Sequence, residues 1–301
     1  MFLRQLSYLV ALDHFRHFSR AAAHCGVSQP ALSTAIRQLE HELGVSIVRR
    51  HHRVLGLTPE GERVVAWARQ SLAALDGLKQ EAGFAHDVAG GSLSIGVMPP
   101  AIQIAPLLAE SLRAAIPALH LEVTVVSSAE VMHGLAEERF NLGLIYLDQQ
   151  TAVPNIEEHT LYREQHVLVA ATGVSLPGRT RCSWSDAAEL PLCLLDRSMK
   201  SRQIVDSAFE KAGVKKPDIQ FETNALELLH AELKAGRLAS ILPIAALPSA
   251  SREGGLNIRR LEPSPEVPVG LVRLRRPLVS ALMDCVWKTL TGLDLTSALK
   301  L

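Results

Sequence analysis

The segment from Ser19 to Ser33 predicts two short helices joined by a tight turn. Ser19 is placed to cap the first helix, and Gly26 suits the left-handed conformation in which many helices end. Ser28 is placed to cap the second helix, with Pro30 in its first turn. Two helices joined in this way form a helix-turn-helix, whose second helix enters the major groove of DNA. The segment therefore predicts DNA as a partner.

Charge is distributed unevenly along the chain, although its 31 basic and 31 acidic residues cancel overall. Residues 1–57 hold seven arginines against three acidic residues, a net charge of +4. The remaining 24 basic and 28 acidic residues give −4. A basic amino-terminal segment attracts phosphate, and an acidic remainder limits indiscriminate binding to DNA.

Several classes of protein are disfavoured by the sequence. Arg4 and Asp13 interrupt the amphipathic start, unlike a secretory leader, and no apolar run has the length of a membrane span. The four cysteines, at positions 25, 182, 193 and 285, form no CxxC pair, so we expect a reduced, cytoplasmic protein. The Walker loop, GxGxxG, GxSxG and HExxH motifs do not occur, so we expect no enzyme, catalytic residue, cofactor or metal.

A basic hairpin and a long helix follow the two short helices. Gly44 and Gly56 bracket a short basic segment that predicts a hairpin, or wing. Thr58 and Pro59 begin a helix that runs to about residue 85. Small and apolar residues recur along this helix in alternating steps of three and four: Val64, Ala68, Ser71, Leu75, Leu78, Ala82 and Ala85. Such a stripe packs either on the protein's own body or, as we favour, on the same helix of a second copy.

From residue 93 onward, strand-like and helix-like segments alternate. We expect strands at 93–97, 119–127, 140–147, 161–171, 191–196, 219–223, 238–242 and 267–274, with helices at 101–115, 128–138, 201–212 and 226–235. This alternation predicts an α/β fold with mostly parallel sheets and helices on their faces. Two sets of strands predict two subdomains with a cleft between them for a small ligand.

The residues from Ser19 to Arg50, followed by Leu57-Thr58-Pro59-Glu60-Gly61, resemble the LysR-type transcriptional regulators. The resemblance is specific over residues 1–65, and the remaining architecture is similar to the whole length of the family. It implies a winged helix-turn-helix at 1–58, a linker and dimerisation helix with a hinge at 59–90, and a periplasmic-binding-protein-like effector module at 91–301. Within that module, subdomain 1 would comprise 91–163 and 266–301, and subdomain 2 would comprise 164–265.

The resemblance also implies partners. The chain would form a homo-oligomer, a dimer through the linker helix and then a tetramer, that binds double-stranded promoter DNA. It would activate or repress transcription in response to a small effector, with RNA polymerase as a further partner.

The predicted DNA-binding residues lie mainly on the second helix of the motif. Gln29, Ser33 and Arg37 share one face at helical spacing; glutamine pairs well with adenine and arginine with guanine. The full set is Arg20, Ser28, Gln29, Pro30, Ser33, Thr34, Arg37, Arg50 and Arg53. Arg50 and Arg53, on the hairpin, are assigned to phosphate or an adjacent minor groove. Ala35 stands where the family has a polar residue, so Arg37 would carry more of the base recognition.

The predicted effector-binding residues follow the ends of the expected strands. They are Met98, Pro100, Ala101, Ser127, Ser128, Tyr146, Arg197, Ser198, Thr223 and Asn224. The helix start after residue 97 attracts anions, but two prolines remove two N–H donors, which indicates a small or weakly polar effector. Arg197 either binds a carboxylate or belongs to a solvated basic loop. The run LPLCLLD is similar to regulators found beside formate dehydrogenase genes, which makes formate our candidate carboxylate.

Two alternatives stay open. A thiol-based redox sensor would use Cys182 and Cys193; arginines flank Cys182, whereas the apolar run around Cys193 favours an inert thiol. A small-molecule-binding protein without a DNA function would share the α/β body but not the basic amino-terminal segment. His14 and His17 lack a third metal ligand at suitable spacing, which favours solvated or packing histidines.

Overall fold

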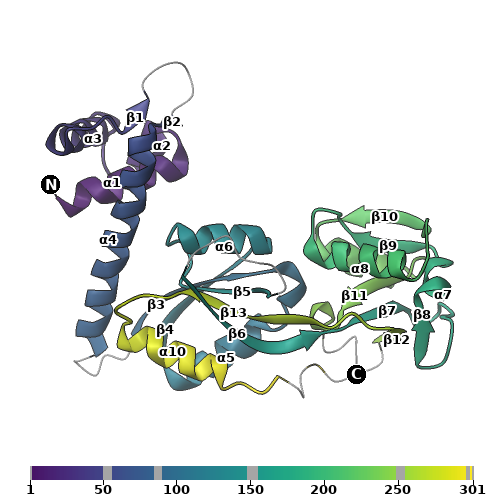
Figure 1. Ribbon diagram of the computed structural model, residues 1–301. Helices are drawn as coiled ribbons and strands as arrows, with labels where there is room; N and C mark the ends of the chain where they lie inside the picture. Colours follow the sequence, from purple (N-terminus) through teal and green to yellow (C-terminus); the bar gives the residue numbers. More distant parts are fainter. Residues whose placement is uncertain are drawn as a thin grey trace. The chain divides into compact units, whose positions relative to one another are not determined.

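The computed structural model describes residues 2–49, 56–84, 90–147, 155–248, 255–295 and 299. The chain forms two compact units, Met1–Val88 with Val279–Leu282, and Ala89–Leu278 with Met283–Leu301 (Figure 1). The elements of the first unit are α1 (Leu3–Phe15), α2 (Phe18–His24), α3 (Gln29–Leu43), β1 (Val48–Arg49), β2 (Gly56–Leu57) and α4 (Pro59–Phe84).

The first unit forms the expected helix-turn-helix, wing strands and long helix. The hydroxyl of Ser28 accepts the N–H of Ala31 at the start of α3, and Gly26 adopts φ +66° after α2. The predicted cap at Ser19 is wrong, because α2 begins at Phe18 with His17 before it and no side-chain cap. Phe18 packs against the core of the unit, which explains why the helix extends past Ser19.

The first subdomain of the second unit is built on a five-stranded sheet. Its elements are β3 (Gly90–Val97), η1 (Pro99–Ala101), α5 (Ala105–Ala115), β4 (Ala118–Val125), α6 (Ser128–Ala136), β5 (Leu142–Tyr146), β6 (Ile156–Glu164), β13 (Val267–Leu274) and α10 (Ala281–Thr291). The strand order is β4-β3-β5-β13-β6. Helix α6 covers one face of this sheet, and α5 and α10 cover the other (Figure 1).

The second subdomain contains two smaller sheets, with strand orders β11-β7-β12-β8 and β10-β9. Its elements are β7 (His166–Ala171), β8 (Arg181–Ser183), α7 (Trp184–Ala188), β9 (Leu192–Leu195), α8 (Lys200–Lys211), β10 (Ile219–Thr223), α9 (Leu226–Ala235), β11 (Ser240–Pro243), η2 (Ile244–Ala246) and β12 (Leu256–Glu262). Apolar side chains of β7, β9 and β11 form its buried centre.

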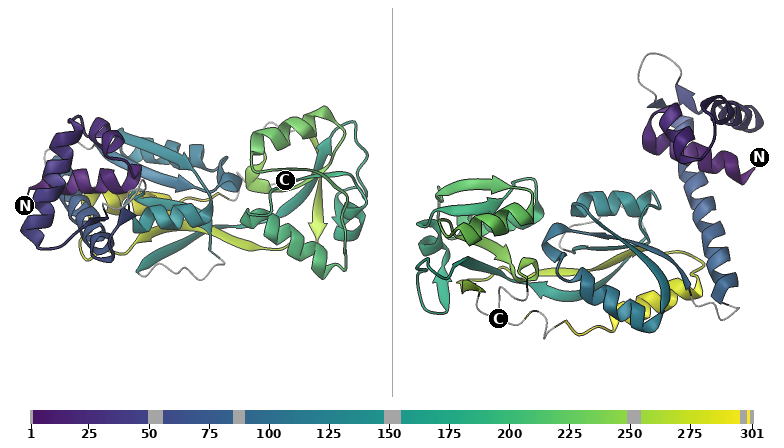
Figure 2. Two further views of the ribbon diagram at one scale, coloured as in Figure 1. Left: turned by 90° about the horizontal axis from the view of Figure 1, so that it is seen from above. Right: turned by 180° about the vertical axis from the view of Figure 1, so that it is seen from behind.

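The sheets are mixed, whereas mostly parallel sheets were predicted. Strand β13 is antiparallel to β5 and β6, and β7 is antiparallel to β11 and β12. The antiparallel pairs arise because the chain passes twice between the two subdomains, in opposite directions. Strand β6 continues into β7, and β12 continues into β13 (Figure 2). The single strand predicted at 161–171 is accordingly two strands, β6 and β7, on either side of Gln165.

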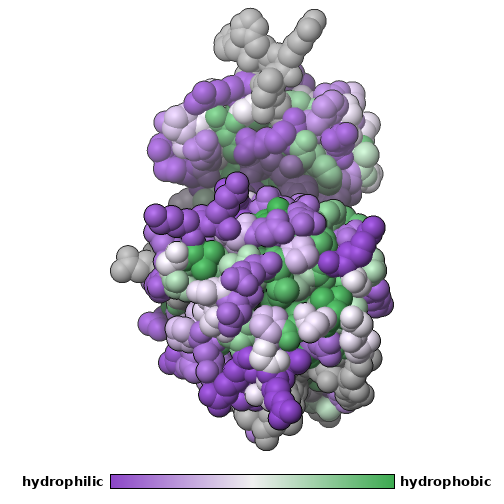
Figure 3. Space-filling view, turned by 90° about the vertical axis from the view of Figure 1, so that its right-hand side faces the viewer, coloured by the Kyte–Doolittle hydropathy of each residue, from purple (hydrophilic) through white to green (hydrophobic). Residues whose placement is uncertain are grey.

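The surface is mixed in character. Hydrophilic side chains cover most of the face shown in Figure 3, and hydrophobic ones form smaller patches between them. Within the described residues, we find no helix that combines the length and the apolar character needed to cross a bilayer.

A buried acidic side chain lies where β6 passes into β7. Glu164 is 1% exposed, and its carboxyl oxygens accept the Tyr162 hydroxyl at 3.2 Å and the Gln165 N–H at 3.2 Å. Burial raises the pKa of Glu164 to about 8. The carboxyl is therefore mostly protonated at neutral pH in the folded protein, but ionised in the unfolded chain above its ordinary pKa of 4.5.

We predict that Glu164→Gln stabilises the protein at neutral pH. Between pH 4.5 and 8 the folded state holds a proton that the unfolded state has lost, so stability falls as the pH rises through this window. A neutral amide removes that cost, which reaches about 3 kcal/mol at pH 7. Urea unfolding at pH 5 and pH 7 measures the difference, which should fall to about 1 kcal/mol at the lower pH. Glu158→Gln, exposed on the same strand, is the control; an equal effect of both variants would contradict the prediction.

Candidate functional site

Helix α3 has a buried face and an exposed polar face. Its apolar side chains Leu32, Ile36 and Leu39 are fully buried in the core of the first unit. On the opposite side, Thr34 and Arg37 are exposed, and the Arg37 guanidinium donates to the Thr34 hydroxyl at 3.4 Å. The exposed face therefore offers hydrogen-bonding side chains held at a fixed helical spacing, which is what contact with base edges requires.

The other predicted DNA-binding residues occupy different positions. Gln29 and Pro30 are exposed at the start of α3, Ser33 is half-buried, and Arg20 is exposed on α2. The Ser28 hydroxyl is engaged in capping α3. Arg50 and Arg53 lie outside the described residues.

Arg49 was not included in the predicted set, although it is exposed on wing strand β1. Its neighbour Val48 is 4% exposed, so the two side chains alternate between core and solvent as in any half-buried strand. The basic run that begins at Arg49 was the available signal.

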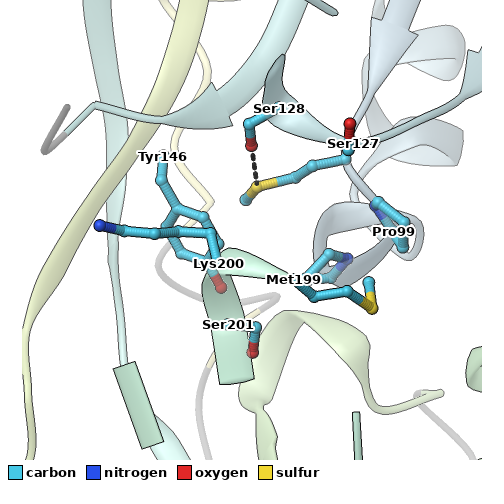
Figure 4. A pocket seen from close by; sticks show the side chains of 9 residues that line it. Pro99, Ser127, Ser128, Tyr146, Met199, Lys200 and Ser201 are labelled. Carbon is cyan, nitrogen blue, oxygen red and sulfur yellow. Dashed lines mark hydrogen bonds between the residues drawn. The ribbon is translucent and has the colours of Figure 1, made fainter. Parts of the chain in front are cut away.

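A small pocket lies between the two subdomains of the second unit (Figure 4). Its volume is about 30 Å³, so in this conformation it offers room for a small ligand. The residues lining it are Met98, Pro99, Pro100, Ser127, Ser128, Tyr146, Met199, Lys200 and Ser201. The Ser128 hydroxyl contacts the Met98 sulfur at 3.7 Å.

The pocket brings together half of the predicted effector-binding residues: Met98, Pro100, Ser127, Ser128 and Tyr146. The other five do not line it. Ala101 is fully buried, while Arg197, Ser198 and Asn224 are exposed. Thr223 is nearly buried, and its hydroxyl accepts the N–H of Ala225 at 3.1 Å.

The N-termini of α6 and α8 reach the pocket. They differ in whether an acidic side chain in the first turn offsets the positive end of the helix dipole. At α6, the Glu130 carboxylate accepts the N–H and the hydroxyl of Ser127, which lower the pKa of Glu130. At α8, the chain supplies no capping side chain and no acidic residue in the first turn. Lys200 and Ser201 stand there instead and line the pocket. The positive end of α8 favours an anion on this side. The Lys200 side chain lines the pocket and extends past the Tyr146 ring (Figure 4).

A neutral histidine lies behind Ser201. The Nε2 atom of His166 is 3.2 Å from the Ser201 hydroxyl, and burial lowers the pKa of His166 to about 4. The imidazole is therefore uncharged at neutral pH. It adds a hydrogen-bonding partner to the base of the pocket without adding charge.

The thiols of the second subdomain are buried. Cys182 is 5% exposed and Cys193 is fully buried, and burial raises the pKa of each thiol to about 11. The reactive thiolate is thus scarce at neutral pH. Among the described residues, no three histidine, cysteine or acidic side chains are grouped as a metal site would require.

Comparison with known proteins covers nearly the whole chain. Residues 3–62 match the family model "Bacterial regulatory helix-turn-helix protein, lysR family", and residues 86–293 match "LysR substrate binding domain". A "Probable hydrogen peroxide-inducible genes activator" of Streptomyces viridosporus is 32% identical over 87% of this chain and 85% of its own length. The "DNA-binding transcriptional dual regulator OxyR" of Escherichia coli K12 is 31% identical over 90% of this chain and 89% of its own.

Solved structures share the fold. A full-length OxyR variant from Pseudomonas aeruginosa has a TM-score of 0.73 at 25% identity, covering 97% of this chain and 93% of that one. Full-length CbnR, solved in complex with its target DNA, has a TM-score of 0.66 at 23% identity, covering 96% and 99%.

The two matching models together span the helix-turn-helix unit and the pocket-bearing unit, and the named relatives are transcriptional regulators. The chain therefore belongs to the LysR family of DNA-binding transcriptional regulators that respond to an effector.

Proposed function

We propose that this regulator responds to a small anion, a carboxylate the size of formate, bound in the pocket between its subdomains. The observation that carries the proposal is the uncompensated N-terminus of α8, which places Lys200 and Ser201 against a cavity of about 30 Å³. Contact with both subdomains lets such an anion favour one arrangement of the second unit over others.

We propose further that the exposed face of α3 recognises bases and that the wing contacts phosphate. The support is the solvent-facing position of Arg37 on α3 and of Arg49 on β1, beside the basic segment that contains Arg53. Base contacts carry sequence preference, whereas phosphate contacts carry salt dependence.

The two arginines should therefore differ in their effects on DNA binding. We predict that Arg37→Ala weakens binding to a preferred duplex by about 1–3 kcal/mol and leaves binding to unrelated DNA nearly unchanged. Arg53→Ala should weaken binding to all duplexes alike and reduce the salt slope by about 1. Gel-shift titrations over a salt series, with a duplex selected from a random pool by the unaltered chain, measure both effects. Equal losses of specific and non-specific binding in the two variants would contradict this division.

The anion should stabilise the folded protein. At a concentration of about 100 times its Kd, a bound ligand adds about 2.7 kcal/mol, which appears as a higher melting temperature. We predict such an increase with sodium formate, acetate or oxalate relative to sodium chloride at equal ionic strength. Lys200→Met should abolish it, whereas Lys211→Met, exposed at the far end of the same helix, should not. The same shift in both variants would place the anion elsewhere.

A peroxide response is the second candidate function, because the names of the relatives carry it. The buried thiols of Cys182 and Cys193, with their raised pKa values, favour the anion instead. Hydrogen peroxide should accordingly leave the mobility of the DNA complex unchanged. The peroxide response would replace the anion response as the proposed function if peroxide changed the mobility, Cys182→Ser abolished that change, and no carboxylate shifted the melting temperature.

We also propose that α4 pairs with α4 of a second copy, along a stripe different from the one expected. Ala68 is 2% exposed and packs with Val65 in the core of its own unit, so it is not available to a partner. The exposed stripe runs instead through Trp67, Ser71, Ala74 and Leu78, with Trp67 70% and Leu78 65% exposed. Ala82 is exposed, and Ala85 lies outside the described residues.

Leu78→Glu should weaken self-association through α4. A charge within a helix seam must be desolvated when two helices pair, so we expect a smaller species in sedimentation velocity. Lys79→Gln, exposed beside it, is the control. Unchanged sedimentation of Leu78→Glu would rule out this stripe as the contact.

A further inference from the structure

Three segments of the first unit meet at the peptide of Ile47, just before wing strand β1. The Glu40 carboxylate, on α3, accepts the N–H of Ile47 at 2.8 Å and the N–H of Val48 at 3.0 Å. On the other side, the N–H of Thr58 donates to the carbonyl of Ile47 at 2.9 Å. The backbone just before β1 is therefore hydrogen-bonded both to a side chain of α3 and to Thr58, the residue that precedes α4.

The Thr58 hydroxyl ties this junction to α4 in two ways. It donates to the carbonyl of Ser46 at 2.5 Å and accepts the N–H of Gly61 at 2.9 Å, which caps the helix. One hydroxyl thus links the segment before the wing with the first turn of α4. Loss of this hydroxyl would remove the hydrogen bond to Ser46 and the cap on the first turn of α4.

Gly61 lets the backbone of α4 approach the same peptide. A Cβ atom at this position would lie 2.2 Å from the carbonyl oxygen of Ile47, a separation that no side chain tolerates. The neighbouring atoms are backbone, so they yield only if the wing segment or the helix moves. The contact is therefore sensitive to a single methyl group.

The junction joins the two elements assigned to DNA. Helix α3 carries Arg37, and β1 carries Arg49 and leads toward Arg53. A charged carboxylate that accepts two backbone N–H groups forms stronger hydrogen bonds than a neutral acceptor does. Because Ile47 is fully buried, these bonds also satisfy backbone groups close to the core of the unit.

We propose that Glu40, Thr58 and Gly61 are positioning residues for DNA binding. They form a clamp around the Ile47 peptide that fixes the wing relative to α3 and α4, so that wing and recognition helix engage a duplex as one body. The proposal rests on the DNA surface proposed above. It assigns no DNA contact to the three clamp residues themselves.

The test uses the full chain and a duplex selected from a random pool by the unaltered protein, with affinity measured by fluorescence anisotropy over a salt series. Glu40→Ala should weaken binding by about tenfold or more. It should also flatten the salt dependence, because each lost phosphate contact lowers the slope by about 0.9. Glu40→Gln keeps an acceptor oxygen for the two N–H groups and should retain most of the affinity.

Two matched controls separate the clamp from other effects. Glu42→Ala makes the same charge change on the same helix, at an exposed residue bonded to Gln38, and should leave the salt slope unchanged. Gly61→Ala should reduce affinity, whereas Gly77→Ala, also in α4 but with open space around it, should not. Circular dichroism of each variant checks that the helices are formed, and Glu40→Gln and the glycine pair carry the test if Glu40→Ala does not fold.

The outcomes distinguish the clamp from the DNA surface on which it rests. Equal affinities and salt slopes for Glu40→Ala and Glu42→Ala, or equal affinities for the two glycine variants, would overturn the clamp. An unchanged salt slope in Arg53→Ala would instead contradict the assignment of phosphate contacts to the wing.

Discussion

The antiparallel pairing of β6 with β13 is the interaction on which the second unit depends. The two strands pair from Ile156 opposite Leu274 to Glu164 opposite Val267, with one shift of register between Val269 and Gly270. Strand β6 continues into β7, and β12 leads into β13, so the chain passes twice between the subdomains. In the second subdomain, β7 and β12 pair with each other. Both connections between the subdomains therefore lie side by side. A motion of one subdomain against the other would bend these strands at their crossing and would change the pocket between the subdomains.

Local chemistry in the sequence predicted the first unit well. The caps at Ser28 and Thr58 are formed as expected, because a hydroxyl before a helix has few better partners than its free N–H groups. Ser19 is not a cap because α2 begins one residue earlier, at Phe18, which is partly buried and packs against the core. The stripe predicted along α4 is divided for a related reason, since Ala68 packs in the core of its own unit while Ser71 and Leu78 are exposed. Periodicity shows that a helix has an apolar side, but it does not show which turns pack on their own domain.

The second unit was predicted in its segments but not in its connections. The segment 161–171 gives no sign of the crossing at Gln165, because no glycine or proline marks the junction between the polar end of β6 and the apolar strand β7. Strands β8 and β12 were not predicted, since β8 has only three residues and β12 contains two arginines and two acidic or amide side chains. Their pairing is a tertiary effect that no local pattern reports.

The candidate pocket shows the same limit at the scale of single residues. The ends of the expected strands led to residues between Met98 and Tyr146 that line the pocket. After β9, however, the chain continues through a turn before α8 begins at Lys200. Arg197 remains in that turn and pairs with Glu222 at 3.6 Å. The end of a strand indicates a loop, but the start of the next helix decides which residues of that loop line the pocket.

The distribution of charge around the crossing bears on the sensing role proposed for the pocket. Glu164 and His166 stand on either side of Gln165, and burial keeps both neutral near pH 7. The strands can therefore bend without exposing or burying a charge at the crossing itself. An anion at the N-terminus of α8 would then be the charge that changes during the response, and Ser201 connects it to His166.

A ligand shifts an equilibrium only by the difference in its affinity for the two states. The second subdomain offers the N-terminus of α8, which has no acidic residue in its first turn. The first subdomain offers the N-terminus of α6, where Glu130 already supplies a negative charge. An anion bound between them would therefore differ in affinity between two states in which the distance between the subdomains differs.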